Sequence, residues 1–435
     1  MTRAHMTENP CGALLGAGWW AVAALLAPLL RVNLRRRAQR GREIVACLPQ
    51  RRGIASQKRP TGRIIWLHAA SVGENVAIVP VIGRLVVSHP QLHVLVTTGT
   101  VTGADVLMTR LADMPGHERV IHQFAPLDVP RWIDRFLAHW QPDVAALVES
   151  ELWPNLINAC QHRRIALALV NGRMSDRSLA GWRRAHCLLR RMLSAFAWVM
   201  ARSTEDAERL IHAGASRIAL VADLKDAAPA LPCNPAELAL LRHRLAGRPV
   251  WIAASTHPGE DVTIMAAAEL VRHAVPDALG ILIPRHPERG TEIAAMSAPA
   301  PPRRTLEQWP AAHDGLWIVD TLGETGLFYS LSAPVVLGNS LPGCAGGGHN
   351  PNEPARMGCP IAHGPQTGNF RVAYTRLGNS VRCVNTAADI ARWVIPLLQQ
   401  PASARALGAR TRALAAPDPE IADQVARALV ALGNG

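Results

Sequence analysis

A glutamate follows the first strongly apolar run of the chain and could act in catalysis. The run RIIWLH, residues 63–68, leads into AASVGENVAIVP, in which Ser71 and Gly73 precede Glu74. Such a run is typical of a buried strand, and the segment after it of a helix, so Glu74 would lie in the turn between them. A carboxylate in that turn could act as a general base. It could equally favour the start of the helix through the helix dipole.

Two further carboxylates lie close together in the segment VESELWPNL. Glu149 and Glu151 are two residues apart, just before Trp153 and Pro154. Neighbouring carboxylates can separate their pKa values, which leaves one of them available for acid or base chemistry. Alternatively, they cap a helix whose first residue is Pro154. Together with Glu74, they are the candidate catalytic residues.

The second half of the chain contains a glycine-rich loop that could bind a phosphate. The segment GCAGGGHNPNEPA includes Gly346, Gly347 and Gly348, which would let the backbone approach an anion closely. A helix after the loop would present free N–H groups to that anion, and Glu353 could accept hydrogen bonds from ribose hydroxyls. Taken alone, a glycine run is more often an ordinary loop. Other polar segments after apolar runs are STH at 255–257, PRHPER at 284–289 and DTLGETG at 320–326.

The histidines and cysteines do not show the spacing of metal ligands. No pair among His257, His286 and His349 has helical ligand spacing, and no DxD-type acidic pair precedes a diphosphate site. We interpret these histidines as hydrogen-bond donors to phosphate or sugar, or as ordinary core or surface residues. The eight cysteines are scattered without a CxxC pair, which favours free thiols in a reducing compartment. We therefore expect no metal and no other cofactor.

The elements that must position these residues are short strands alternating with helices. This alternation begins at residue 63 and predicts βαβ units on parallel sheets. Residues 227–235, AAPALPCNP, resemble a linker. We expect two α/β domains, residues 63–226 and 227–435, with a cleft between them, and ligands at the carboxyl ends of the strands. The strand candidates are RIIWLH, LHVLVTT, VAALVES, IALALVNG and FAWVMARS before the linker, and VWIAAS, GILIPRHP, LWIVDT and APVVLGNS after it.

Residues 1–62 are expected to form a membrane anchor and a basic segment. Residues 11–30 are a run of twenty residues without a charge, and a helix of that length, at about 1.5 Å per residue, spans a bilayer core. Arginines follow at once, so the positive-inside rule puts the rest of the chain in the cytoplasm. A cleaved signal peptide fits less well because its charges precede the apolar run. A helix lying in the membrane interface remains an alternative because a span is weakened by Gly12, Gly16, Gly18 and Pro28.

The charge balance favours negatively charged partners. The chain has 46 basic and 33 acidic residues and a net charge of +13, although only Lys58 and Lys225 are lysines. Between residues 31 and 63, eleven basic residues against one acid suit anionic lipid headgroups or simply signal topology. No nucleic-acid-binding module is evident, so we expect no nucleic-acid partner. A non-catalytic membrane scaffold would explain the basic segment but not the carboxylates and the glycine loop.

The order and wording of these segments resemble one family, the 3-deoxy-D-manno-oct-2-ulosonic acid (Kdo) transferases of lipopolysaccharide assembly. The resemblance covers almost the whole chain. It implies an α/β fold of the GT-B glycosyltransferase type, in which two Rossmann-like domains face a cleft, here after an N-terminal anchor helix. The segments are HAASVGE at 68–74, TTGTVTGAD at 97–105, PLDVP at 126–130, ESELWPNL at 149–156, LVNGRMSDRS at 169–178, ASTHPGE at 254–260, PRHPER at 284–289, DTLGETG at 320–326 and GGHNPNEPA at 347–355.

The resemblance also implies roles for single residues. Glu74 would be the catalytic base, Glu149 and Glu151 a second acidic element, and Ser71 and Gly73 part of the acceptor site. The donor, CMP-Kdo, would be bound in the C-terminal domain by Ser255, Thr256, His257, Arg285, Gly323, Glu324, Asn350 and Glu353.

The activity implied is an inverting transfer of Kdo from CMP-Kdo to a phosphorylated lipid A precursor at the cytoplasmic face of a bacterial inner membrane. The alternative is another GT-B nucleotide-sugar transferase or an epimerase. Two departures from the family concern the donor site. Ala222-Asp223-Leu224-Lys225 stands where Gly-Asn-Leu-Lys is usual, and Cys344-Ala345-Gly346 lacks a basic residue that often precedes the glycines. Lys225 remains a candidate anion contact, now with a carboxylate beside it.

Overall fold

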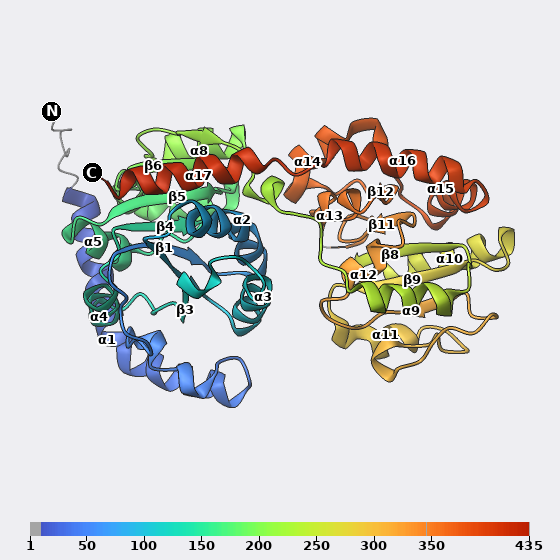
Figure 1. Cartoon of the computed structure of the whole chain (residues 1–435), viewed down its shortest axis with the longest axis horizontal. Helices are drawn as coiled ribbons and strands as arrows, with labels where there is room; N and C mark the ends of the chain where they lie inside the picture. The colour runs from blue at the N-terminus through green and yellow to red at the C-terminus, as the bar shows by residue number, and fades with distance from the viewer. Residues whose placement is uncertain (1–9, 345, 435) are drawn as a thin grey trace. The chain divides into compact units, whose positions relative to one another are not determined.

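The computed structural model describes residues 10–344 and 346–434. The chain divides into two compact units (Figure 1). The first unit ends at Ala228 and is completed by the segment that begins at Pro417, and the second unit is Pro229–Ala416. Each unit is built on one parallel sheet. The expected α/β class is therefore confirmed.

The first sheet has its topological switch point between β1 and β4. The order is β3-β2-β1-β4-β5-β6-β7, so the chain runs outward from β1 and then returns to its other side. Ligands of open parallel sheets bind at the carboxyl ends of the strands on either side of such a switch. The strands are β1 (Arg63–Ala69), β2 (Leu92–Thr98), β3 (Val120–Phe124), β4 (Val144–Val148), β5 (Ala166–Gly172), β6 (Trp198–Ala201) and β7 (Leu220–Val221).

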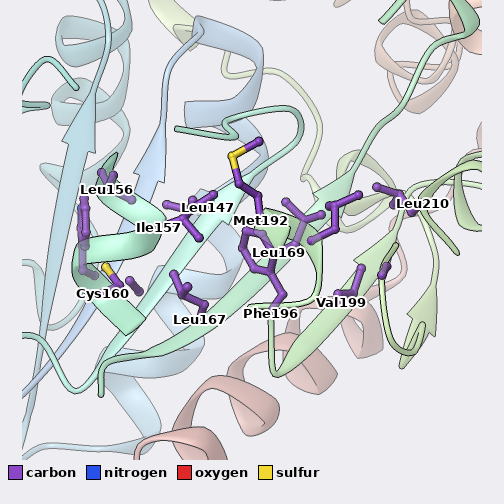
Figure 2. Packing of buried hydrophobic residues seen from close by; sticks show 14 of the residues in the cluster. Leu147, Leu156, Ile157, Cys160, Leu167, Leu169, Met192, Phe196, Val199 and Leu210 are labelled. Atoms are coloured by element: carbon purple, nitrogen blue, oxygen red, sulfur yellow. The ribbon is translucent and has the colours of Figure 1, made fainter. Parts of the chain in front are cut away.

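Helices cover both faces of this sheet and close two apolar cores. On one face, Leu147 and Leu169 of the sheet pack with Leu156 of α5 and with Phe196 (Figure 2). The strands are buried on both sides, which explains their nearly continuous apolar sequences. The helices of this unit are α1 (Pro10–Gln39), α2 (Val72–Ser88), α3 (Val101–Leu111), α4 (Pro130–Trp140), α5 (Pro154–His162), α6 (Asp176–Trp182), α7 (His186–Leu193), α8 (Thr204–Ala213) and α17 (Pro419–Leu432).

The last helix corrects one expectation. We assigned all C-terminal helices to the second domain, but α17 packs beside α2 of the first unit (Figure 1). Its apolar stripe, which includes Ile421, Val425 and Leu429, is buried in the core on the α2 face of the sheet. The stripe cannot be assigned to one domain from sequence because an amphipathic helix does not specify which apolar surface covers it.

Residues 40–62 also belong to the first unit rather than to a separate juxtamembrane segment. Arg51 is buried, is paired with Glu43 at 3.0 Å, and donates hydrogen bonds to the carbonyls of Gly99 and Ala125, which follow β2 and β3. The expected domain boundary at residue 63 is therefore wrong. At least this arginine stabilises strand ends and is not available to lipid headgroups.

The helix α1 is, among the described residues, the one long and apolar enough to cross a membrane by length and composition. It continues beyond the expected apolar run to Gln39. One side of α1 contacts α4, α5 and α7 of the first unit and buries Ala23 and Leu34. Large apolar side chains on the rest of its surface are exposed, including Leu14 at 74% and Leu25 at 79%. An apolar surface of this kind is typical of contact with a membrane or with another protein.

The second sheet repeats the same plan. Its order is β10-β9-β8-β11-β12-β13, with the switch between β8 and β11. The strands are β8 (Val250–Thr256), β9 (Leu279–Pro284), β10 (Leu316–Ile318), β11 (Val335–Leu337), β12 (Ile361–His363) and β13 (Val381–Cys383). The helices are α9 (Pro235–Leu245), α10 (Asp261–Ala274), α11 (Gly290–Ala294), α12 (Thr325–Tyr329), α13 (Asn352–Arg356), α14 (Arg371–Leu377), α15 (Ala387–Gln399) and α16 (Pro401–Leu414).

Candidate active site

Glu74 lies at the switch point of the first sheet, in the first turn of α2. Its carboxylate folds back over the start of its own helix, where it accepts hydrogen bonds from the Ala70 N–H and the Ser71 hydroxyl, each at 2.7 Å. Ser71 in turn accepts a hydrogen bond from the Glu74 N–H at 3.3 Å. Glu74 therefore does stabilise the start of its helix, and these hydrogen bonds fix its carboxylate at the carboxyl end of β1.

The environment of Glu74 makes it a stronger base than an ordinary glutamate. Only 7% of the residue is exposed, and this burial raises the pKa of its carboxyl group. Hydrogen bonds from Ser71 and Ala70 act in the opposite direction, while the negative charges of Glu149 and Glu151 raise the pKa further. The structure thus brings the three candidate carboxylates within electrostatic reach of one another.

Gly73, expected as part of the acceptor site, lies inside the first turn of α2. No atom lies within 4 Å of the position that a Cβ atom would occupy there. The glycine therefore leaves open space beside Glu74 and is not required by the turn.

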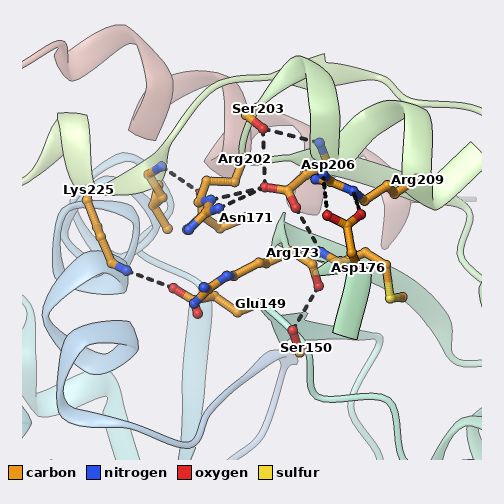
Figure 3. Close-up of polar contacts among 12 residues, drawn as sticks. Glu149, Ser150, Asn171, Arg173, Asp176, Arg202, Ser203, Asp206, Arg209 and Lys225 are labelled. Carbon is orange, nitrogen blue, oxygen red and sulfur yellow. Dashed lines mark hydrogen bonds and ion pairs between the residues drawn. The ribbon is translucent and has the colours of Figure 1, made fainter. Parts of the chain in front are cut away.

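Glu149 directly follows β4 and pairs with one of the two lysines of the chain. The backbone of Glu149 is in the left-handed region, with a φ of 56°, and its Oε1 atom lies 2.9 Å from the Nζ atom of Lys225 (Figure 3). Both side chains are mostly buried, so this ion pair is screened less than a surface pair. Few residues other than glycine have left-handed backbone, and those that do are concentrated at functional sites.

Glu151 is held by two donors. Its Oε2 atom accepts hydrogen bonds from the indole N–H of Trp153 at 2.6 Å and lies 3.2 Å from Nε2 of His68. Burial would raise the pKa of Glu151, but the hydrogen bonds and charge of His68 and the hydrogen bond from Trp153 lower it below its usual value. Glu74 and Glu151 thus have pKa values shifted in opposite directions.

Three residues near these carboxylates escaped sequence reasoning. His68 is buried in β1 and contacts Thr97 as well as Glu151. Asn171, at a φ of 57°, accepts a hydrogen bond from the Leu224 N–H and so positions the segment that carries Lys225. Arg173 follows β5, and its backbone N–H donates a hydrogen bond to the Glu149 carbonyl at 3.3 Å. All three lie within the family segments quoted above, so their place in those segments could have identified them as candidates.

Asp223, one of the departures from the family, has a local structural role. Its Oδ1 atom accepts a hydrogen bond from the Lys225 N–H at 2.9 Å and caps the short 3-10 helix η5 (Leu224–Ala227). Burial raises the pKa of Asp223, and the positive charge of Lys225 opposes this shift. The added carboxylate therefore supports the turn that presents Lys225 to Glu149. Ala345, part of the other departure, lies outside the described residues.

In the second unit, a buried carboxylate that we did not single out ties the switch-point loops together. Glu260 is fully buried and accepts hydrogen bonds from the backbone N–H of His257 after β8 and of Asn339, Ser340 and Leu341 after β11. The four donors lie between 2.7 and 3.0 Å from its oxygens. The sequence segment ASTHPGE contained Glu260, but three of its four partners are about 80 residues away along the chain and cannot be read from it.

The segment Ser255–His257 lies at this switch point as expected. Ser255 has left-handed backbone with a φ of 59°. Thr256 is buried and donates a hydrogen bond to Asp261 at 2.9 Å, and Asp261 is paired with Arg289 at 2.5 Å. Thr256 thus belongs to a buried polar network, whereas the side chain of Arg285 is exposed.

Three histidine rings gather at the same place. The rings of His257 and His349 stack at 5.3 Å, with their Nε2 atoms 3.2 Å apart, and His286 lies 5.7 Å from His257. Burial lowers the pKa of His257 and lowers that of His349 to about 4, so both rings are neutral near pH 7 and can donate one N–H each. Among the described residues, no group of three or more His, Cys, Asp or Glu side chains is arranged to hold a metal ion.

Gly323 and Glu324 follow β10 at a different strand end. Gly323 has a φ of 83° and open space beside it. Glu324 is paired with Arg304 at 2.6 Å and accepts a hydrogen bond from Thr321. Burial opposes ionisation of Glu324, but the hydrogen bonds from Arg304 and Thr321 lower its pKa. A ligand at Glu324 would therefore meet an ion pair that is already formed.

The glycine loop is more constrained than a simple phosphate cradle. Gly346, Gly347 and Gly348 all have positive φ, and Cβ atoms at the first two would collide with Gln366 and Asn369. The positive φ of all three residues therefore favours glycine whether or not a phosphate binds there.

The helix that follows the glycine loop is shorter than expected. It is α13, which has only five residues. Asn350 Oδ1 accepts a hydrogen bond from the first N–H of this helix, that of Asn352, at 3.1 Å. Asn350 also lies 3.4 Å from Glu353. The first N–H group of this helix is therefore not free for an anion.

Comparison with known proteins agrees with this architecture. The sequence profile of the family described as 3-deoxy-D-manno-octulosonic-acid transferase (kdotransferase) matches residues 46–228. A protein of Arabidopsis thaliana named probable mitochondrial 3-deoxy-D-manno-octulosonic acid transferase is 36% identical over 392 residues, which are 86% of each chain. The 3-deoxy-D-manno-octulosonic acid transferase of Bordetella pertussis is 34% identical over 92% of this chain and 95% of its own.

Solved structures extend the likeness to the fold. The UDP-GlcNAc 2-epimerase of Neisseria meningitidis has a TM-score of 0.58 at 12% identity and aligns with 85% of this chain and 100% of its own. At that identity, the likeness concerns the GT-B type of fold alone. The sequence relatives lead to one conclusion: the chain belongs to the 3-deoxy-D-manno-octulosonic acid transferase family, whose members are glycosyltransferases.

Proposed function

We propose that this protein transfers Kdo from CMP-Kdo to a lipid A precursor of the tetraacyldisaccharide 4′-phosphate type, with inversion at the anomeric carbon. The observation that carries the proposal is the carboxylate cluster at the β1/β4 switch point. One member, Glu74, is buried with a raised pKa, while its neighbour Glu151 is held ionised by hydrogen bonds. Carboxylates with pKa values driven apart are the arrangement that acid–base catalysis requires.

The proposed chemistry is a single displacement. Glu74 removes the proton of an acceptor hydroxyl. At the same time, the oxygen of that hydroxyl bonds to the anomeric carbon of Kdo, and the bond from this carbon to the phosphate oxygen of CMP breaks. CMP leaves as an anion. Glu149 and Glu151 form the second acidic element, and Ser71 and Gly73 border the acceptor hydroxyl. The open space beside Gly73 gives the acceptor room to approach Glu74.

The negative charges of both substrates suit the cationic groups of the chain. Kdo carries a carboxylate, CMP a phosphate and the acceptor a phosphorylated sugar, and each is matched by arginine or lysine more strongly than by neutral donors. Lys225 is the candidate anion contact of the first unit. In the second unit, the proposed CMP-Kdo site consists of Ser255, Thr256, His257, Arg285, Gly323, Glu324, Asn350 and Glu353. That no metal or other cofactor takes part stays a prediction.

The proposed location is the cytoplasmic face of a bacterial inner membrane, with α1 as the anchor. The exposed apolar side chains of α1 supply the membrane contact, and the arginines after residue 30 favour the cytoplasmic side and anionic lipids.

We expect the detergent-solubilised protein to add the mass of Kdo to a lipid A precursor when CMP-Kdo is present, and Glu74→Gln to slow this reaction. Gln preserves size and hydrogen bonding but cannot accept the proton, so turnover should fall by roughly 10² to 10⁴. Mass spectrometry of the lipid product measures both results, and CMP affinity should be almost unchanged.

Glu149→Gln and Glu151→Gln are the controls for that experiment. If either substitution abolishes turnover while Glu74→Gln keeps most of it, the base lies in the ESELWP segment and our assignment is wrong. If the wild-type protein gives no Kdo-sized mass increase under any condition, the proposed reaction itself is refuted.

Glu353→Ala should weaken CMP binding, because the carboxylate beside Asn350 would no longer accept hydrogen bonds from the ribose hydroxyls. Charge-assisted hydrogen bonds contribute about 1.5–3 kcal/mol, which corresponds to a more than tenfold increase in Kd. Titration calorimetry with CMP measures the change. Glu269→Ala, at an exposed position of α10, is the matched control. Equal CMP affinity in the two variants would show that the nucleotide does not bind at Glu353.

The double substitution Leu14→Glu and Leu25→Glu should release the protein from membranes, because charges on the exposed face of α1 oppose burial in lipid. Co-sedimentation with vesicles that contain anionic phospholipid measures the bound fraction. Leu240→Glu, at a 47% exposed position of α9, should leave that fraction unchanged. Undiminished binding of the double variant would argue against α1 as the membrane contact.

A further inference from the structure

The N-terminus of α5 directly follows the loop that carries Glu149 and Glu151, and it has no capping side chain of its own. Trp153, the N-cap residue, makes no side-chain cap hydrogen bond, and Pro154 has no N–H to offer. The N–H of Ile157 already bonds to the Trp153 carbonyl. The N–H groups of Asn155 and Leu156 are the donors of the first turn that require a partner from elsewhere.

Asp128 supplies that partner from the loop between β3 and α4. Its Oδ1 atom accepts a hydrogen bond from the Leu156 N–H at 2.9 Å, and its Oδ2 atom accepts one from the Asn155 N–H at 3.2 Å. The Asn155 side chain donates to the Asp128 carbonyl at 2.7 Å. A carboxylate at a helix N-terminus is also favoured by the helix dipole. Asp128 thus fixes the position of α5, and with it the loop 149–153.

The anchor helix reaches the same carboxylate. The indole N–H of Trp19, in the apolar part of α1, donates to Asp128 Oδ2 at 2.8 Å. The contact is part of a wider docking of α1, because α1 also contacts α5 and α7. At Trp19, therefore, α1 lies against the first unit.

Trp19 also helps to keep Asp128 ionised. Burial raises the pKa of Asp128 to about 6, and the hydrogen bond from Trp19 opposes that shift together with those from Asn155 and Leu156. A protonated carboxyl group is a weaker acceptor for the two N–H groups of α5 than a carboxylate. Loss of the Trp19 hydrogen bond would therefore loosen the start of α5 as well as α1.

We propose that Asp128 is a positioning residue for the transfer reaction, and that Trp19 of the anchor helix acts through it on the loop that carries Glu149 and Glu151. Docking of α1 thereby supports the geometry of the carboxylate cluster in addition to bringing the enzyme to the membrane. The inference rests on the proposed function for its effect on turnover. Its effect on the mobility of the loop is independent of that function.

The test compares Trp19→Phe and Asp128→Asn with Trp20→Phe in the full-length protein. Trp19→Phe removes the donor and keeps an aromatic ring. Trp20 is the matched control, because its ring is also exposed on α1 and its indole N–H makes no hydrogen bond to the described part of the chain. Hydrogen–deuterium exchange of residues 149–157 reports on the loop, and kcat and KM for CMP-Kdo report on the reaction.

We expect faster exchange of the amides of residues 151–156 in Trp19→Phe and Asp128→Asn, and unchanged exchange in Trp20→Phe. Because a small displacement of catalytic groups is costly, kcat should fall roughly ten- to a hundred-fold in the first two variants while KM for CMP-Kdo stays constant. Wild-type exchange in Trp19→Phe, or an equal effect of Trp20→Phe, overturns the proposal. If the wild-type protein transfers no Kdo, the proposed function fails, but the exchange experiment still decides the inference.

Discussion

Crowding of negative charge at one sheet edge is the constraint on which the first unit depends. Glu74, Glu149 and Glu151 follow β1 and β4, the two strands on either side of the switch point. Three carboxylates can be held together in a mostly buried place only if each has its own partners. Glu149 has Lys225, Glu151 has His68 and Trp153, and Glu74 has the start of its own helix. Glu74 is held only by neutral donors, the Ala70 N–H and the Ser71 hydroxyl. Because these donors do not offset the effect of burial, the pKa of Glu74 is raised.

In the second unit, one buried carboxylate holds the loops on both sides of the switch point. Glu260 accepts four backbone hydrogen bonds from the loops after β8 and β11, so the two sides of the switch point are held by a single buried side chain. The loops that carry His257 and the glycine run then extend from this fixed point. In both units, buried polar groups position the strand ends, and the residues proposed to meet substrate are attached to them.

Much of the architecture could be predicted from the sequence because parallel strands buried on both faces are nearly continuous apolar runs. Every strand candidate that we named overlaps a strand. The strands that we missed, β3, β7, β12 and β13, are short or contain polar residues such as His122 and Gln123 of β3. The placement of α17 and of Arg51 could not be predicted because each depends on a surface formed by distant parts of the chain. The same limit applies to Asp128 and to Glu260, because most of their partners lie far away in sequence.

The pH dependence of kcat in the wild-type enzyme and in Glu149→Gln tests the central claim that Glu74 is the base within this cluster. Glu74 must be ionised to accept a proton, so kcat should fall as the pH drops through its raised pKa. The negative charge of Glu149 contributes to that raised pKa, and removing it should lower the pKa of Glu74. We therefore predict that the acid limb of the kcat profile moves to lower pH in Glu149→Gln. An acid limb that stays in place or moves to higher pH would contradict the account.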